Sequence, residues 1–201
     1  MSVPVPSLQT FLLSRPIHKR GRIGVTMTYN WDNLPASLAL DNPLWRYALA
    51  AWRSPEVEHA CLELQARHWC VSHILIAAWL GTQDRHYEGE AESVRQWREQ
   101  ITGILRAARK QIPRQQSALS PFRKQLASAE LEAERVELAL AYESLKRPGK
   151  TDSNGPAQPD LTRNNLLTAS PTPNFDLDTE RLVDALVRHL PQDSFNGADT
   201  P

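Results

Sequence analysis

Five histidine and cysteine residues that could ligate a metal ion fall within one short stretch of the chain. They are His59, Cys61, His68, Cys70 and His73. On a helix, His59 and Cys61 point about 200° apart, and Cys61 and His68 lie two turns, about 10 Å, apart. Zinc bonds of about 2.0–2.3 Å cannot span that separation. Only Cys70 and His73 could chelate one ion together. The favoured interpretation is therefore ordinary core and surface side chains, and the alternative is a small enzyme or metal-binding protein that uses the His59–His73 region.

Acidic residues form a second group that could do chemistry. Glu130, Glu132, Glu134, Glu137 and Glu143 include pairs three and four residues apart. General acid–base catalysis would need such carboxylates buried and facing one another, whereas acids on a long helix usually form a solvated face paired with neighbouring cations. The sequence also has no nucleophile elbow, zinc-protease motif or phosphate-binding glycine loop. We predict no catalytic residue, no cofactor and no metal.

Basic residues are concentrated between Arg95 and Lys124. This stretch holds eight basic residues and one acid, Glu99, for a net charge of +7, whereas the segment from Glu130 to Glu143 has five acids and Arg135. Such a patch can contact an acidic protein surface or nucleic-acid phosphates. The alternative is that the cations only complement the negative end of a helix dipole. The predicted partner-binding residues are Arg106, Arg109, Lys110, Arg114, Arg123 and Lys124.

Prolines divide the chain into the elements that must position these residues. No proline occurs between Glu56 and Ile112 or between Phe122 and Arg147, and proline inside a helix costs about 3 kcal/mol. Long helices are therefore expected in these two windows. Asn42-Pro43, Ser54-Pro55 and Ser120-Pro121 are start signals, with a capping side chain followed by proline at the first helical position.

The stretch from Val71 to Leu80 is apolar on nearly every side, and Gly81 stands where a C-terminal cap is expected. A helix that is apolar all round must be enclosed, and ten residues reach only about 15 Å, half of what a bilayer requires. We predict that this helix is the buried centre of the domain. The preceding helices should face it through Trp45, Ala48, Leu49 and Trp52, and through Val57, Cys61, Leu64 and His68. Trp69, in a turn, is expected to be partly exposed.

Two longer helices follow, each with an apolar stripe at alternating spacings of three and four residues. The first begins near Glu90 and ends at Pro113, and the second runs from Ser120 for about 26 residues. The short connection between them predicts an antiparallel hairpin. The stripes, expected to face inward, are Val94, Trp97, Ile101, Ile104 and Ala108 on the first helix, and Phe122, Leu126, Ala129, Ala133, Val136 and Leu140 on the second.

The predicted fold is all-α, an antiparallel bundle of about five helices over residues 42–147. Residues 1–41 are predicted to be loosely ordered, 148–177 to be a flexible linker, and 178–191 to form a short amphipathic helix from Thr179 to Leu190, capped by Asp178. Two cysteines are too few for a disulfide framework, and the chain has no signal-like or transmembrane-length apolar run. We therefore expect a cytoplasmic protein without a membrane partner.

Three groups of residues resemble a known family. Trp45-Arg46-Tyr47-Ala48-Leu49, Cys61-Leu62-Glu63-Leu64-Gln65 and Trp79-Leu80 are similar to the run W-x-[FY]-A-L … P-x-V-E-x-A-C-L-x-L-Q … L-L-x-x-x-W-L of a proteobacterial conserved hypothetical family, a domain of unknown function. The resemblance covers about Asn42 to Leu145. It implies a small, mainly helical bacterial protein without an assigned activity. The stretch Trp69–His73 departs from the family pattern, which has a glycine-containing turn there.

The functional prediction follows from these patterns together. We expect a non-catalytic interaction or regulatory module that presents the basic end of the predicted hairpin, and its C-terminal amphipathic helix, to a protein partner. Contact with RNA or DNA through the same basic end is an alternative.

Overall fold

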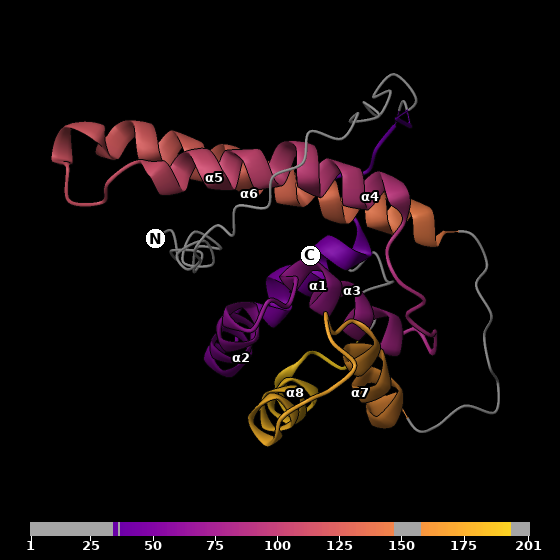
Figure 1. Cartoon of the computed structure of the whole chain (residues 1–201). Coiled ribbons are helices and arrows are strands. Elements are labelled where there is room, and N and C mark those ends of the chain that lie inside the picture. Colours follow the sequence, from indigo (N-terminus) through magenta and orange to yellow (C-terminus); the bar gives the residue numbers. More distant parts are fainter. Residues whose placement is uncertain (1–33, 36, 147–157, 194–201) are drawn as a thin grey trace, which may run out of the picture.

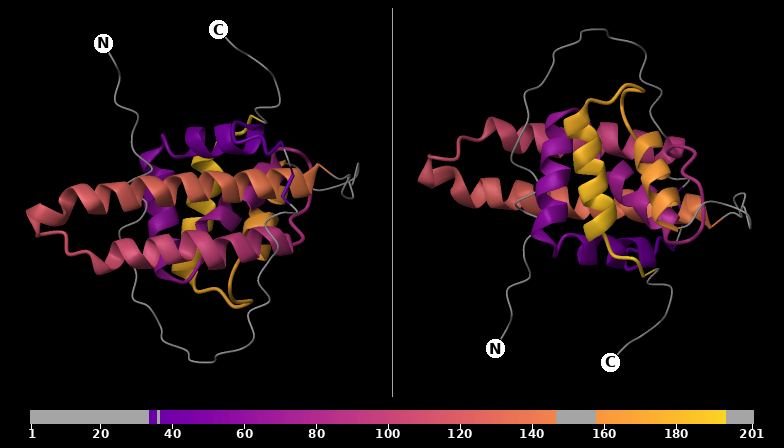
Figure 2. Two further views of the ribbon diagram at one scale, coloured as in Figure 1. Left: turned by 90° about the horizontal axis from the view of Figure 1, so that it is seen from above. Right: turned by 90° about the horizontal axis from the view of Figure 1, so that it is seen from below.

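The computed structural model describes residues 34–35, 37–146 and 158–193. The predictions for residues 1–33 and for 147–157 lie outside this part of the chain. Within it, the fold is all-α, as predicted. A long helical hairpin lies across a second layer formed by shorter helices, and one end of the hairpin extends well beyond that layer (Figures 1 and 2).

The first two helices begin where the sequence predicts. Helix α1 (Pro43–Ala51) is capped by Asn42, whose Oδ1 accepts a hydrogen bond from the Trp45 amide at 2.9 Å. Helix α2 (Pro55–Ala66) is capped by Ser54, whose Oγ accepts from the Val57 amide at 3.3 Å. Both caps satisfy amides that have no partner inside the helix.

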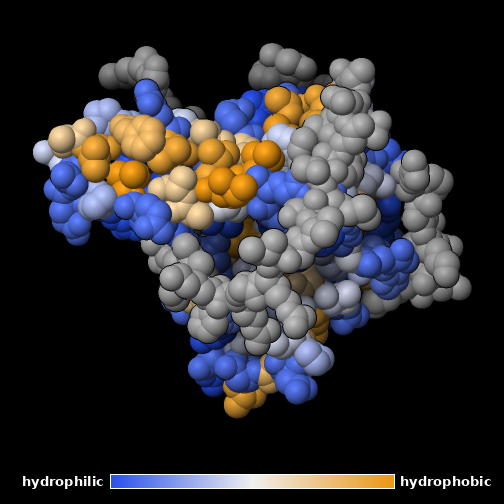
Figure 3. Space-filling view, turned by 45° about the horizontal axis from the view of Figure 1, so that its top comes forward, coloured by the Kyte–Doolittle hydropathy of each residue, from blue (hydrophilic) through white to orange (hydrophobic). Residues whose placement is uncertain are grey.

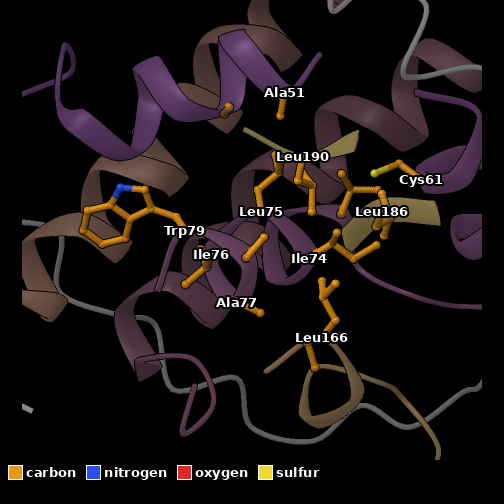
Figure 4. Packing of buried hydrophobic residues seen from close by; sticks show 14 of the residues in the cluster. Ala51, Cys61, Ile74, Leu75, Ile76, Ala77, Trp79, Leu166, Leu186 and Leu190 are labelled. Atoms are coloured by element: carbon orange, nitrogen blue, oxygen red, sulfur yellow. The ribbon is translucent and has the colours of Figure 1, made fainter. Parts of the chain in front are cut away.

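Helix α3 (Val71–Gly81) is the enclosed centre that its sequence predicts. Every side chain from Ile74 to Leu80 is at most 5 % exposed. Helices α1, α6 and α7 pack against it, and α2 touches its edge. Side chains of α1, α2, α7 and α8 converge on Ile74 and Leu75 (Figure 4).

Gly81 has a different role from the predicted C-terminal cap. It lies inside α3, and the cap residue is Thr82 in a right-handed conformation. A Cβ at Gly81 would come within 2.9 Å of the Thr162 Cα and closer still to its Oγ1. The glycine therefore permits a close approach of helix α7 (Gln158–Thr168). The sequence predicted a linker for this segment.

Helix α7 (Gln158–Thr168) lies within the predicted linker 148–177 and is the main difference from the predicted organisation. The buried Asn165 fixes it in place. Its Nδ2 donates to the carbonyls of Ala77 and Arg85 at 3.2 and 2.9 Å, and its Oδ1 accepts from the Tyr87 amide at 2.9 Å. Polar composition concealed this helix because its anchor is an amide rather than an apolar stripe.

Helix α8 (Leu177–His189) packs on α2 and α7 through Val183 and Leu186. Its cap is Asp176, whose Oδ1 accepts from the Thr179 amide at 2.7 Å, instead of the predicted Asp178. The loop before α8 brings Phe175 against Trp69, with ring centroids 6.4 Å apart. Trp69 is consequently only 4 % exposed, so the prediction that it is partly exposed is wrong.

The inward face of α1 is shifted from the predicted one. Leu44, Tyr47, Ala48 and Ala51 are buried, whereas Trp45 and Leu49 are only partly buried. Trp45 instead lies under the Arg135 guanidinium of α6, 5.5 Å from the ring centroid. The shift places α1 between α3 and α6.

The hairpin consists of two long helical segments. The first is α4 (Glu92–Trp97), a π-helical turn η3 (Arg98–Thr102) and α5 (Gly103–Gln111); the second, after the 3-10 turn η4 (Ser117–Leu119), is α6 (Ser120–Leu145). The C-terminal half of α6 packs on α1 and α3, whereas α5 packs mainly on α6 and continues from η3. We call residues 103–131, which extend past the second layer, the distal hairpin. Nowhere in the described ranges is a helix long and apolar enough to cross a membrane.

Candidate functional site

The interior of the distal hairpin is ionic rather than apolar. Arg106 Nε lies 2.8 Å from Oε1 of Glu130, and Arg106 Nη2 lies 2.6 Å from Oε1 of Glu134. Arg109 Nε lies 2.5 Å from the other oxygen of Glu130. Glu130 is fully buried and Arg109 is 2 % exposed. We call these four residues the ion-pair ladder; they join α5 to α6, and Glu134, which accepts from Arg106, lies just beyond the distal hairpin.

A further arginine, Arg123, joins α6 to the C-terminal end of α5 beside the ladder. Arg123, in the second turn of α6, donates from Nη1 to the backbone carbonyl of Ile112 at 2.9 Å and also to that of Arg109. The Arg109 carbonyl lies in the last turn of α5 and also accepts from the amide of Ile112, the C-cap residue of this helix. Arg123 thus caps α5 from the opposite helix and fixes the angle at which the chain reverses.

Burial changes the proton affinity of the ladder. It raises the pKa of Glu134 to about 8, although the nearby Arg106 guanidinium opposes this shift. Burial also raises the pKa of Glu137, one turn further along α6. Glu137 lies 3.9 Å from Arg98, and the nearby Ser72 and Thr102 hydroxyls and this guanidinium only partly oppose the rise. These carboxyl groups therefore favour the neutral form more than exposed glutamates do.

The apolar residues of the distal hairpin lie on its outside. Ile104 is 61 % exposed and Phe122 is 50 % exposed. They belong to stripes of three- and four-residue spacing, so each stripe occupies one face of its helix. We call the following set the apolar face: Ile104 and Ala108 on α5, Ile112 at its C-cap, and Phe122, Leu126 and Ala129 on α6. Figure 3 shows apolar residues gathered along one side of the projecting hairpin.

This face corrects one of the sequence predictions. The stripes were expected to face inward along their whole length, and the proximal residues Val94, Ala133 and Leu140 are indeed buried. Of the distal stripe residues, Ile104, Ala108, Phe122 and Ala129 are exposed and Leu126 is partly buried, because the hairpin extends beyond the layer that covers its proximal half (Figure 1). The three- and four-residue spacing identified which side of each helix is apolar. It could not show how far along the hairpin the second layer covers that side.

The six predicted partner-binding residues all lie in the distal hairpin, in two kinds of environment. Arg106 and Arg109 are engaged in the ion-pair ladder, and Arg123 caps α5. Arg114 and Lys124 are exposed near the tip, and Lys110 is partly buried. A partner could therefore reach Arg114 and Lys124 without breaking the ladder.

A separate pocket brings together three of the five predicted histidine and cysteine residues. Its volume is about 310 Å³, and it is lined by His68, Cys70, His73, Tyr87, Gly89, Glu90, Thr168, Ala169, Ser170 and Pro171. His59 is exposed on α2, and Cys61 is in the core. His68 and Gly89 have positive φ angles of 73° and 104°. Two reversals of the backbone thus form walls of the pocket.

The charged groups of this pocket already contact one another. Glu90 accepts hydrogen bonds from the Arg98 guanidinium, and its Oε2 lies 2.9 Å from Nε2 of His73. Burial opposes ionisation of Glu90, but the Arg98 and His73 hydrogen bonds outweigh it and lower its pKa to about 2. The hydroxyls of Thr168 and Ser170 donate to backbone carbonyls. Glu90, Thr168 and Ser170 are therefore already engaged within the protein, and His68, Cys70 and Tyr87 add further polar groups to the lining.

The thiols and imidazoles do not form a recognisable reactive centre. Burial raises the pKa of both Cys61 and Cys70, which disfavours the thiolate that a nucleophile or a metal ligand requires. Over the described residues, no three histidine, cysteine, aspartate or glutamate side chains are placed to share a metal ion.

Comparison with known proteins gives one similarity. Residues 43–140 match the model of a family described as "Protein of unknown function (DUF2390)". The matched segment begins with α1, includes the whole distal hairpin and ends within α6, before α7 and α8. No curated protein and no solved structure matches the chain. The predicted resemblance to an uncharacterised family is thus supported, and the bacterial source stays a prediction.

Sequence reasoning missed how the distal hairpin combines its two kinds of residue. Arg106 and Arg109 are three residues apart, and Glu130 and Glu134 are four apart. These spacings place each pair on one helix face and could have indicated a ladder once the hairpin was predicted. The sequence prediction instead assigned the acids to a solvated face and the basic residues to a partner-binding patch, so it did not pair the two sets with each other.

Proposed function

We propose that the protein is a non-catalytic interaction module, and that the apolar face of the distal hairpin is its docking surface for a protein partner. The observation that carries this proposal is the inverted arrangement of the hairpin. Its interior is an ion-pair ladder, while Ile104 and Phe122 are at least half exposed. Contiguous exposed apolar residues on a protein are typical of interaction sites.

Stability alone gives no reason for this arrangement. Buried ion pairs are often no more stabilising than well-packed apolar residues of similar volume, because desolvation of the charges offsets their attraction. A hairpin that buried Ile104 and Phe122 instead would gain about 1.5–3 kcal/mol for each large side chain removed from water. The ladder holds the two helices together while leaving the apolar residues accessible, which is what a docking surface requires.

The test removes the apolar face without changing charge. Ile104→Gln with Phe122→Gln should leave the unfolding free energy within about 1 kcal/mol of the wild-type value, because both residues are exposed. The same variant should lose partner proteins that are cross-linked to the wild type in cells and identified by mass spectrometry. Leu177→Gln is the matched control, since Leu177 is 71 % exposed on the body. Equal recovery of the same partners by all three proteins would contradict the proposal.

A second candidate function is the binding of a small ligand in the pocket beside His73, favoured by its volume of about 310 Å³. Differential scanning fluorimetry against a metabolite library, repeated with His73→Gln, tests it. Stabilisation of the wild type that disappears in the variant would support this function. If no compound in the library raises the melting temperature of the wild type, the pocket does not have this function.

A further inference from the structure

The charge of the distal hairpin indicates the charge that a partner of its apolar face should carry. Between Gln100 and Ala129 the chain has six basic residues and no acidic residue. Glu130 and Glu134 face inward to Arg106 and Arg109, so they do not offset the cations at the tip. Arg114 and Lys124 are exposed there. The distal hairpin therefore combines apolar residues with positive charge.

The shape of the apolar face favours a helix as the occupant. Ile104 to the C-cap residue Ile112 covers about two turns, about 12 Å, and Phe122 to Ala129 covers a similar length of antiparallel α6. A third amphipathic helix can place its own apolar side along exposed stripes of this length.

We infer that the apolar face receives an amphipathic helix of another protein whose apolar stripe is flanked by aspartate and glutamate. Acidic flanks would complement the basic tip, whereas like charges across an interface are costly. A second copy of this hairpin would bring basic residues together at the tip and is therefore a poorer occupant. This inference rests on the proposed function and specifies the partner of the same surface.

The chain's own acidic helix does not supply this occupant. Helix α8 carries Asp178, Glu180 and Asp184, but Val183 and Leu186 on its apolar side are fully buried against its own domain. Releasing α8 would expose the core of the second layer. Helix α8 is therefore not the occupant, and we assign the partner helix to another molecule.

The experiment is a fluorescence-anisotropy titration of the full-length protein with three designed helical peptides. The first has three heptads with leucine at the a and d positions and glutamate at the flanking positions. The second has lysine in place of glutamate, and the third has glutamine in place of leucine. The acidic leucine peptide should bind at least tenfold more tightly than either control, and its affinity should fall as salt increases.

Protein variants separate the two contributions. Ile104→Gln with Phe122→Gln should abolish binding of the acidic peptide, and Arg114→Glu with Lys124→Glu should weaken it at least tenfold. Leu177→Gln should bind like the wild type. Equal binding of the acidic and lysine peptides, no effect of charge reversal, or no binding at all would overturn the inference.

Two further measurements test the other occupants. Sedimentation showing a wild-type dimer that Ile104→Gln with Phe122→Gln dissociates would identify a second copy as the occupant and overturn the inference. Binding of duplex RNA or DNA that needs Arg114 and Lys124 but not Ile104 and Phe122 would also overturn it. If the peptides fail while cross-linked partners still depend on Ile104 and Phe122, the inference fails and the proposed function stands. If neither peptide binding nor partner cross-linking depends on Ile104 and Phe122, the inference and the proposed function both fail.

Discussion

Glu130 is the residue on which the distal hairpin depends most. It is fully buried and bridges Arg106 and Arg109 through its two oxygens. Removing it would leave two guanidinium groups without their shared carboxylate, and breaking a buried ion pair in this way costs about 3–5 kcal/mol. We expect Glu130→Ala to lower the unfolding free energy by about that amount in urea denaturation.

Glu132 provides the matched control for this substitution. It lies on the same helix, its side chain is 64 % exposed, and its nearest cation is Arg135 at 3.8 Å. Exposed pairs of this kind contribute at most about 1 kcal/mol, so Glu132→Ala should be nearly neutral. Similar losses for the two variants would show that the ladder does not stabilise the hairpin.

Glu134 should make stability depend on pH. The folded protein holds its proton up to about pH 8, whereas the carboxyl has a pKa near 4.5 without the protein environment. The folded state therefore binds this proton more tightly, and the contribution of Glu134 to the unfolding free energy falls as pH rises from 4.5 towards 8. Glu134→Gln removes this dependence but keeps the shape of the side chain.

Urea denaturation of both proteins at pH 5 and pH 8 measures this effect. Stability of Glu134→Gln relative to the wild type should rise between the two pH values. Parallel pH profiles would show that the ion pair with Arg106 keeps Glu134 ionised throughout.

At the scale of elements, the fit between α3 and α7 depends on Gly81. Alanine in a solvated helix is usually more stable than glycine by about 0.8–1 kcal/mol. Here the added Cβ would lie 2.9 Å from the Thr162 Cα, a contact with backbone that a rotamer change cannot relieve. We expect Gly81→Ala to destabilise the protein by about 1–3 kcal/mol, as overpacking does.

Hydrogen exchange can locate this effect. Amides of α7 and the buried Tyr87 amide, which Asn165 holds at 2.9 Å, should exchange faster in Gly81→Ala, whereas α5 should be unaffected. A gain in stability together with unchanged exchange in α7 would mean that the two helices separate easily and that the glycine has no packing role.

Some of the helices could be predicted from the sequence and others could not. Asn42-Pro43 and Ser54-Pro55 predicted the starts of α1 and α2, because a cap and a following proline act within a few residues. The all-apolar run of α3 predicted its enclosure, because a helix that is apolar on every side must be covered wherever it lies in the fold. Helix α7 could not be predicted, because Asn165 stabilises it through carbonyls about 80 residues away in the chain.

The candidate site was predicted in part. Charge and spacing placed the six basic residues and the apolar stripes in one hairpin, which the structure confirms. Which of these residues face the interior depends on how far the second layer reaches along α6, and this is a property of the tertiary fold. Local pattern therefore identified the hairpin but assigned its apolar residues to the wrong environment at the distal end.

For the molecule as a whole, the central claim is that the body holds a projecting hairpin whose apolar face is reserved for a protein. Site-specific photo-cross-linking in cells tests it most directly. A photoreactive amino acid at Phe122, on the apolar face, should give a discrete cross-linked protein adduct, and the same amino acid at Leu177, a more exposed position on the body, should not. Adducts of equal yield at both positions, or none at Phe122, would contradict the account.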